Sequence, residues 1–232
     1  MIRYERQQQL LSYLKEHKSA TVAELSGVLF ISEASVRRDI AALEQEGLVR
    51  RKYGGVVLTE YENSVVPLVL RDPANAARKD KIARRAAALV EDGMTLMLDA
   101  SSTARRIVGF LEGKKELRII TNNARLFERC PAGITVYCVG GRYIRENAAF
   151  VGAKAEEFVR GVRADILFFS SQGLSAEGII SDASEEETSL RRAMLDAAKS
   201  SYFLCDGTKR GKEHTFVLCS TEEITGVIGD EE

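Results

Sequence analysis

Residues 21–57 read TVAELSGVLF ISEASVRRDI AALEQEGLVR RKYGGVV, and this stretch decides the fold of the N-terminal part of the chain. Thr21 and Glu24 have the spacing of a capping box, in which each side chain accepts a hydrogen bond from the backbone of the other residue. Apolar residues then recur at helical intervals, residues 30–31 predict a turn, and Ser32 is a good N-cap for a second helix. Two short helices joined by a tight turn and followed by a basic hairpin are typical of a winged helix-turn-helix, which places one helix in the major groove of DNA.

The second helix, expected over Glu33–Gln45, has two faces of different character. Val36, Ile40 and Leu43 share one apolar stripe at about 100° per residue, which predicts the buried side. The opposite face holds no acid and no bulky apolar residue, so the helix backbone can approach base edges closely. Arg37 lies to one side of that face, where it suits a backbone phosphate. The predicted DNA contacts on this helix are Ala34, Ser35, Arg37 and Arg38.

The hairpin that follows is basic and turns on glycine. Three adjacent cations beside a glycine turn suit contact with a phosphate ridge or a minor groove. Two plainer interpretations stay open: the helix face is an ordinary solvated surface with two arginines, and the hairpin is a charged edge that resists aggregation. The predicted DNA contacts in the hairpin are Arg50, Arg51, Lys52, Tyr53 and Gly54.

The composition indicates a soluble globular chain. Hydrophobic residues make up 45% and charged residues 29% of its 232 residues, which is enough apolar material for a packed core. There is no signal peptide and no long apolar run, so we expect a cytoplasmic protein that does not span a membrane. The four cysteines show no Cys-x-x-Cys spacing and there are only two histidines, so we expect buried free thiols, no metal site and no cofactor.

Charge is distributed unevenly along the chain, whose net charge is −1. Residues 1–58 hold nine lysines and arginines against seven acids, a net charge of +2, and the remainder has a net charge of −3. We therefore expect DNA affinity to come from a local basic surface and from oligomerisation, as a homodimer or homotetramer on a double-stranded operator. Arg3 and Arg6, at the start of a supporting helix over residues 3–15, either contact phosphate or are ordinary surface arginines.

Composition and periodicity divide the chain into three parts. Residues 1–58 form the winged helix-turn-helix, residues 59–77 form a linker with two of the three prolines, and residues 78–232 form a second domain. Strands and helices alternate in that domain, which predicts an α/β fold around a mostly parallel sheet. The expected helices are 79–91, 103–111, 123–129, 153–160 and 185–198, and the expected strands are 95–98, 118–121, 135–139, 164–169, 202–205, 215–218 and 226–228.

Polar or glycine-containing segments follow the predicted strands, at the edge where parallel α/β sheets bind their ligands. Hydroxyls and free backbone N–H groups at the start of a helix make an anion site, so Ser102 and Thr103 suit a phosphate. Helix caps and turns use the same residue types and explain any one segment equally well. Five segments in register nevertheless predict a small, polar, phosphorylated ligand. The predicted binding residues are Asp99, Ser101, Ser102, Thr103, Asn122, Asn123, Gly140, Gly141, Gln172, Gly173 and Lys209.

Motifs in both parts of the chain resemble those of the DeoR family of bacterial transcriptional regulators. In that family, a Val-Arg-Arg-Asp-Ile run like the one at residues 36–40 marks the recognition helix, and a Gly-Gly pair marks the wing. The resemblance implies a sensor domain similar in fold to ribose-5-phosphate isomerase, and it adds Glu187 and Arg191 to the expected effector-binding residues. The matching segments are 4–8, 22–25, 32–40, 51–56, 99–103, 121–123, 140–141, 187, 191–194 and 206–209.

The resemblance implies a repressor of a sugar-metabolism operon whose C-terminal domain binds a phosphorylated sugar. Arg191 stands where lysine is usual and Ser184 where Asp or Asn is common, so the identity of the sugar is open. The alternative is a sugar-phosphate isomerase or deaminase fused to a DNA-binding module, in which Asp99, Glu187 and Lys209 do acid–base work. We favour a sensor without catalysis because the expected pocket has no histidine and no obvious pair of carboxylates for proton transfer between carbons.

Overall fold

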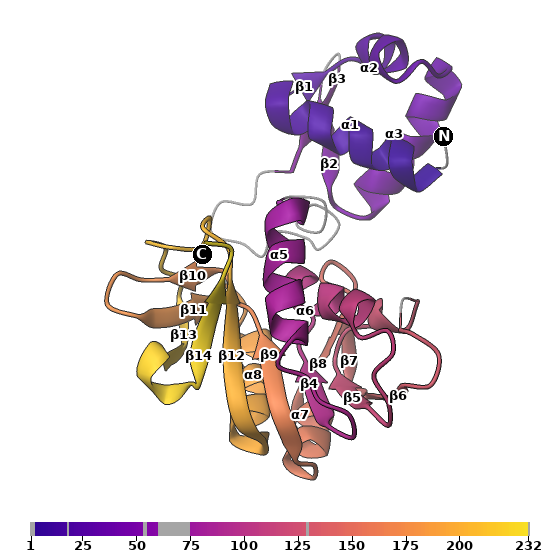
Figure 1. The fold of residues 1–232 in the computed structure, drawn as a ribbon. Coiled ribbons are helices and arrows are strands. Elements are labelled where there is room, and N and C mark those ends of the chain that lie inside the picture. Colours follow the sequence, from indigo (N-terminus) through magenta and orange to yellow (C-terminus); the bar gives the residue numbers. More distant parts are fainter. Residues whose placement is uncertain (1–2, 18, 53–54, 60–74, 129, 232) are drawn as a thin grey trace. The chain divides into compact units, whose positions relative to one another are not determined.

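The computed structural model describes residues 3–17, 19–52, 55–59, 75–128 and 130–231. The chain divides into two compact units, one N-terminal and one C-terminal (Figure 1). Tyr53 and Gly54 of the predicted wing and most of the predicted linker lie outside the described residues. The first helix of the C-terminal unit begins at Ala76, two residues inside the predicted linker 59–77. The domain boundaries at residues 58 and 78 therefore stay predictions.

The N-terminal unit is a helix-turn-helix with a small sheet. Its helices are α1 (Arg3–His17), α2 (Val22–Leu29) and α3 (Glu33–Gln45), and its strands are β1 (Ser19–Ala20), β2 (Val49–Lys52) and β3 (Gly55–Leu58). The strands pair antiparallel in the order β1-β3-β2. This arrangement confirms the predicted N-terminal fold, and α3 has the predicted bounds.

Local hydrogen bonds explain why α2 and α3 begin and end where they do. The Thr21 hydroxyl accepts from the backbone N–H of Glu24 at 3.1 Å, and the Thr21 N–H donates to the Glu24 carboxylate at 2.7 Å. Phe30 ends α2 in the left-handed conformation with φ 53°, and the Ser32 hydroxyl caps α3 by accepting from the Ser35 N–H at 3.3 Å. The two helices then close over one apolar core made by Leu10, Leu14, Leu25, Leu29, Val36, Ile40 and Leu43.

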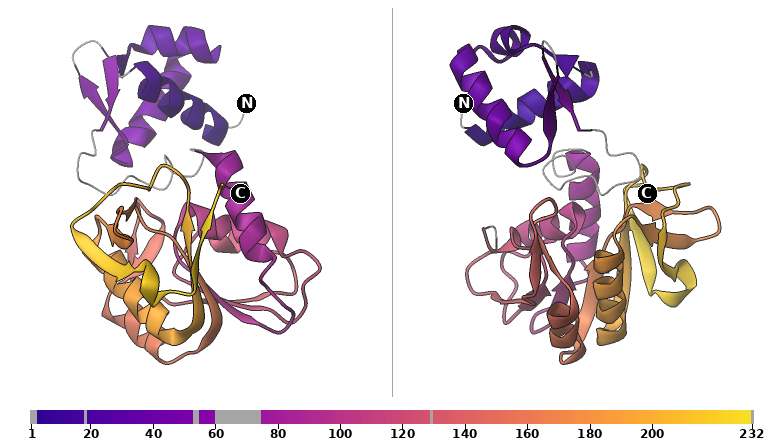
Figure 2. Two further views of the ribbon diagram at one scale, coloured as in Figure 1. Left: turned by 60° about the vertical axis from the view of Figure 1, so that its left-hand side comes forward. Right: turned by 180° about the vertical axis from the view of Figure 1, so that it is seen from behind.

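The C-terminal unit is built on a six-stranded parallel sheet in the order β14-β12-β9-β4-β5-β6 (Figure 1). Helices pack against both faces of this sheet (Figure 2). Alternate residues of each strand enter two different cores: Leu96 and Leu98 pack with α5 and α6, whereas Met97 packs with α7 and α8. The unit therefore has three layers, and the predicted α/β fold around a mostly parallel sheet is confirmed. The strands are β4 (Thr95–Leu98), β5 (Arg118–Thr121), β6 (Thr135–Cys138), β9 (Ala164–Phe169), β12 (Ala198–Cys205) and β14 (Gly226–Gly229), and the helices are α5 (Ala76–Ala87), α6 (Ser102–Arg106), α7 (Ala153–Arg160) and α8 (Glu185–Ala197).

Short antiparallel strands and 3-10 turns complete this unit. The strand expected over 215–218 is β13 (Phe216–Ser220), which forms a three-stranded sheet in the order β10-β11-β13. The sequence did not predict the other two strands of this sheet, β10 (Gly173–Leu174) and β11 (Ile179–Asp182). It also did not predict the hairpin of β7 (Arg142–Ile144) and β8 (Ala149–Val151). The helix expected over 79–91 runs instead from residue 76 to 87, and the one expected over 103–111 is α6 followed by a 3-10 turn. The 3-10 turns are η1 (Ile107–Phe110), η2 (Leu126–Glu128) and η3 (Thr221–Glu223).

Two sequence predictions fail for identifiable physical reasons. Residues 123–128, the described part of the helix expected over 123–129, form no α-helix, because the Asn123 side chain accepts from the Arg125 N–H at 2.9 Å, which favours a turn. Strand β12 begins four residues before the predicted strand 202–205, at a polar stretch that hydrophobicity does not reveal. There Lys199 bonds the Asp165 carboxylate of β9 at 2.7 Å, which supports the extension of the strand.

The cysteines differ in burial. Cys205 and Cys219 are buried, as expected, and burial raises the pKa of the Cys219 thiol to about 12. Cys138, which ends the edge strand β6, and Cys130, which precedes that strand, are only half-buried. The prediction of buried thiols therefore holds for two of the four.

Of the two glycines after β6, only Gly141 is required by close backbone packing. Gly141 has φ +103°, and a Cβ at this position would lie 2.5 Å from the carbonyl oxygen of Val151 and 3.2 Å from the Cβ of Ala155. Gly140 also has a positive φ of +68°, but a Cβ there would meet nothing within 4 Å. The close approach at Gly141 lets β8 and the start of α7 pack against the end of β6.

We expect Gly141→Ala to lower the free energy of unfolding by about 1–3 kcal/mol more than Gly140→Ala, because only Gly141→Ala adds a steric clash to the backbone strain that both variants share. Urea unfolding of the two variants measures the difference. Equal losses would show that the contact with Val151 relaxes without cost.

Candidate functional site

The outward face of α3 carries small and basic side chains. Ala34 and Arg38 are exposed and Ser35 is half-buried. The guanidinium of Arg38 donates to the Ser35 hydroxyl at 3.1 Å, and that hydroxyl lies 3.1 Å from the hydroxyl of Ser32. A neutral hydroxyl therefore orients Arg38 without neutralising its charge.

The other predicted cations of this unit differ from Arg38 in their partners. Arg37 pairs with Glu33 one turn earlier at 3.0 Å, and Arg51 pairs with Glu44 at 3.1 Å. Arg50 is exposed on β2. Lys52 ends β2, but its side chain, like Tyr53 and Gly54, lies outside the description.

The C-terminal sheet has a topological switch point between β4 and β9. From β4 the chain proceeds outward to β5 and β6 on one side, and the later strands β9, β12 and β14 extend the sheet on the other side. Diverging connections leave a crevice at the carboxyl ends of the two strands, where α/β sheets bind ligands. Asp99 directly follows β4 and Ser170 directly follows β9, so both lie at this point.

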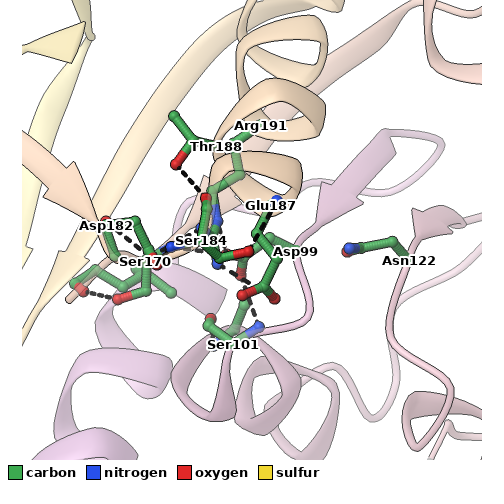
Figure 3. A network of polar contacts seen from close by, with 12 residues as sticks. Asp99, Ser101, Asn122, Ser170, Asp182, Ser184, Glu187, Thr188 and Arg191 are labelled. Atoms are coloured by element: carbon green, nitrogen blue, oxygen red, sulfur yellow. Dashed lines mark hydrogen bonds and ion pairs between the residues drawn. The ribbon is translucent and has the colours of Figure 1, made fainter. Parts of the chain in front are cut away.

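Arg191 of α8 joins the polar side chains around the switch point (Figure 3). Its Nε donates to Asp99 at 2.9 Å, its Nη1 donates to Asp182 at 3.0 Å, and its Nη2 lies 3.8 Å from Glu187. All four side chains are at most 5% exposed. We call these four residues the Arg191 cluster.

Backbone N–H groups compensate for the excess of carboxylates in the Arg191 cluster. Ser101 and Ser170 donate their N–H groups to Asp99 at 3.1 and 3.2 Å, and Ser184 donates to Asp182 at 3.1 Å. Burial lowers the pKa of the Arg191 guanidinium, but the charges of Asp182, Glu187 and Asp99 outweigh burial and hold the pKa above its ordinary value. The guanidinium therefore stays charged.

Other predicted residues connect to this cluster through hydrogen bonds. Lys209, after β12, donates to the Ser170 hydroxyl and, at 3.3 Å, to the carbonyl of Leu204. Gln172 donates to Asp182 at 3.3 Å. The ends of β4, β9, β11 and β12 thus meet in one network of polar contacts.

The start of α6 and the end of β5 present polar groups without partners. The Ser101 hydroxyl caps α6 by accepting from the Ala104 N–H at 3.1 Å, whereas the hydroxyls of Ser102 and Thr103 have no hydrogen bond among the described residues. The Oδ1 of Asn122 and the Nδ2 of Asn123 are buried, also without a partner in the described part of the chain. Figure 3 shows the Asn122 amide directed toward the Asp99 side of the network.

Not every predicted residue joins this network. Gly140 and Gly141 serve the backbone after β6, as described above. Gly173 lets another loop pack closely, because a Cβ there would lie 2.5 Å from the carbonyl oxygen of Lys212. Sequence reasoning missed Asp182 and also Asn147, which donates to Glu187 at 3.0 Å. The position of Asp182, at the end of an apolar strand and two residues before the N-cap of α8, was the available signal.

A helix-turn-helix unit joined to an α/β unit with polar groups at its switch point defines a DNA-binding transcriptional regulator with a sensor domain. Residues 6–62 match the DeoR-like helix-turn-helix domain, and residues 74–231 match the DeoR C terminal sensor domain. The chain belongs to the DeoR family of transcriptional regulators.

Two relatives illustrate this membership. The chain is 31% identical to the HTH-type transcriptional regulator GolR of Listeria innocua, covering 99% of this chain and 91% of GolR. It is 29% identical to the transcriptional repressor AccR of Agrobacterium fabrum, covering 97% and 89%. Ribose 5-phosphate isomerase A from Methanocaldococcus jannaschii superposes with a TM-score of 0.44 at 17% identity, covering 59% and 55%, a likeness too low to bear on activity.

The described residues include neither a membrane-spanning helix nor a group of side chains that could hold a metal ion. No helix there has the length and apolar character needed to cross a membrane. No group of three or more histidine, cysteine or acidic side chains is arranged to hold a metal ion in the same part of the chain.

We expect Arg191→Met to destabilise the protein by about 3–5 kcal/mol, because it leaves three buried carboxylates without their counter-charge. The control is Arg192→Met, the same change at the next residue, whose exposed guanidinium donates to the carbonyl of Leu218 at 3.3 Å and to the carbonyl of Val217. This control should cost less, about 1–3 kcal/mol for the two hydrogen bonds, because it leaves no buried charge uncompensated. Urea unfolding measures both, and equal costs would contradict the role given to Arg191.

Proposed function

We propose that α3 and the wing bind a double-stranded operator. Arg38, Ala34 and Ser35 face the bases, and Arg37 and the wing residues Arg50, Arg51, Lys52, Tyr53 and Gly54 contact the phosphate backbone. The observation that supports this assignment is the Arg38–Ser35 contact, which leaves a full positive charge on an acid-free helix face. Arginine pairs with guanine through two hydrogen bonds, and small residues permit the close approach this needs.

We infer that the C-terminal unit binds a phosphorylated sugar. We further infer that this binding controls whether the protein represses a sugar-metabolism operon. The supporting observation is the convergence at one switch point of side chains from the ends of β4, β5, β9 and β12. Ser101, Ser102 and Thr103 suit the phosphate with Lys209 as its counter-charge, and the unpartnered amide atoms of Asn122 and Asn123 suit sugar hydroxyls. The remaining predicted residues Asp99, Gln172, Glu187, Arg191, Gly140, Gly141 and Gly173 shape the pocket.

The inferred activity is binding without turnover. An acid–base catalyst needs a carboxylate or amine within reach of the substrate proton. Asp99 already accepts from Arg191 and from two backbone N–H groups, and Glu187 accepts from Asn147. These contacts favour the sensor over the isomerase alternative. Incubation with sugar phosphates should return them unchanged.

We also propose that the protein acts as a homo-oligomer, a dimer or a tetramer. One helix-turn-helix on one half-site binds weakly, and two readers on neighbouring half-sites gain affinity and specificity together. Sedimentation of the full-length chain at micromolar concentration tests this proposal, and a monomer would contradict it.

We expect Arg38→Ala to weaken binding to a duplex selected by the protein from a random pool by about 1–3 kcal/mol and to blur the preference at one base pair. Arg50→Ala should instead weaken binding to selected and unrelated duplexes alike, because a phosphate contact carries no sequence information. Fluorescence titration at several salt concentrations separates these effects. If Arg38→Ala kept the same base preference, α3 would not be the recognition helix.

We expect a suitable sugar phosphate, at one hundred times its dissociation constant, to stabilise the protein by about 2.7 kcal/mol, and its unphosphorylated parent to have no such effect. Lys209→Ala should abolish most of the stabilisation, because it removes the counter-charge. The control is Lys212→Ala, which removes an exposed lysine three residues later and should keep the full effect. Thermal-shift screening of a sugar-phosphate panel measures all three proteins. An intact shift in Lys209→Ala would mean that the pocket lies elsewhere.

A further inference from the structure

A groove of about 600 Å³ runs along the boundary between α1 and α3. It joins the start of α1 to the face of α3 that we propose to read DNA, because residues of both helices line it. The lining includes Arg3 and Arg6 of α1 and Ser35, Arg38, Asp39 and Ala42 of α3. The proposed DNA-reading face therefore continues onto the first turn of α1.

Asp39 is an acid on the recognition helix, directly after the two arginines. An acid in this position opposes the approach of DNA phosphates unless a cation holds it. Its carboxylate is 2% exposed and accepts from the Nε of Arg6 at 2.9 Å and from the Nη2 of Arg6 at 3.2 Å. This bidentate contact is the strong form of an arginine–carboxylate pair. Arg6 therefore neutralises Asp39 and fixes the start of α1 against α3.

Arg3 occupies the same face of α1 as Arg6, because residues three apart on a helix are neighbours. Its side chain is 65% exposed, and its Nε lies 3.9 Å from Asp39, at the outer limit of an ion pair. Arg6 lies closer to Asp39 than Arg3 does and forms the main ion pair with it. The guanidinium of Arg3 is therefore available at the solvent side of the groove to bind a phosphate. Arg3 and Arg6 together outweigh the charge of Asp39, so the groove carries a net positive charge next to Arg38.

We propose that the first turn of α1 is a second DNA-contacting element, in which Arg3 binds a backbone phosphate beside the bases that α3 reads. Arg6 is a positioning residue that acts through Asp39: it holds this carboxylate and keeps it from repelling the DNA. The inference rests on the proposed assignment of α3 as the recognition helix.

The first test compares Arg3→Ala with Lys15→Ala in the full-length protein, with a duplex selected from a random pool and an unrelated duplex. Arg3→Ala should reduce the affinity for both duplexes by the same factor, about eightfold at 0.1 M salt for each helix-turn-helix unit that contacts the DNA. The slope of log affinity against log salt concentration should fall in magnitude by about 0.9 for each such unit. Lys15→Ala removes an exposed cation at the other end of α1 and should leave both quantities unchanged.

The outcome for Arg38→Ala separates this inference from the assignment beneath it. If Arg38→Ala loses sequence preference while Arg3→Ala behaves like Lys15→Ala, α3 is the recognition helix and the proposal for Arg3 is overturned. If Arg38→Ala keeps its sequence preference, α3 is not the recognition helix, and the proposal for Arg3 is overturned with that assignment.

The second test asks whether Arg6 acts through the charge of Asp39. Arg6→Ala should weaken binding more than Arg3→Ala does, because it leaves the Asp39 carboxylate beside the reading face without its counter-charge. Adding Asp39→Asn to Arg6→Ala should then recover at least part of the affinity, because the repelling charge is gone. A purely structural role predicts that the double variant binds no better than Arg6→Ala, and that result would overturn the role of Arg6. Circular dichroism confirms that each variant is folded at the assay temperature.

Discussion

The guanidinium of Arg191 is the point on which the C-terminal unit depends, since it binds the carboxylates that end β4 and β11 and lies beside Glu187 on its own helix. Three acids and one base are costly to bury, and each carboxylate is stable there only while hydrogen bonds and the opposite charge of Arg191 compensate it. The backbone N–H groups of Ser101, Ser170 and Ser184 supply that compensation. The cluster consequently fixes the geometry of the crevice in which we place the effector, because it ties the residue after β4 and the last residue of β11 to helix α8.

The N-terminal fold was predictable because its determinants are local. The capping box at Thr21 and the N-cap at Ser32 act within four residues, and the apolar stripe of α3 repeats within four turns. The parallel sheet was also predictable, since buried apolar runs alternate with helices. What failed were polar strands such as the start of β12, whose extension depends on a partner strand more than thirty residues away: Lys199 bonds Asp165.

The candidate site was predictable as a place but only partly as a set of contacts. Strand ends identified Asp99, Lys209 and the asparagines, because topology brings such ends together. The sequence could not reveal that Arg191 contacts Asp99, 92 residues earlier, or that Asp182 completes the cluster. The sequence also could not separate glycines with a packing role from glycines beside a ligand. The clash that a Cβ would cause at Gly141 depends on Val151, which belongs to a hairpin that the sequence pattern did not predict.

The position of β4 in the sheet has a consequence for the order in which the chain acquires structure during synthesis. The apolar core of the N-terminal unit is complete by Val56 and its neighbours, so it can form as soon as these residues leave the ribosome. Strand β4, in contrast, lies between β5 and β9, and Asp99 gains its counter-charge only when α8 is made. Contacts between residues so far apart in sequence form late and slowly. A nascent chain therefore completes the core of its helix-turn-helix unit well before the parallel sheet of its sensor domain can close.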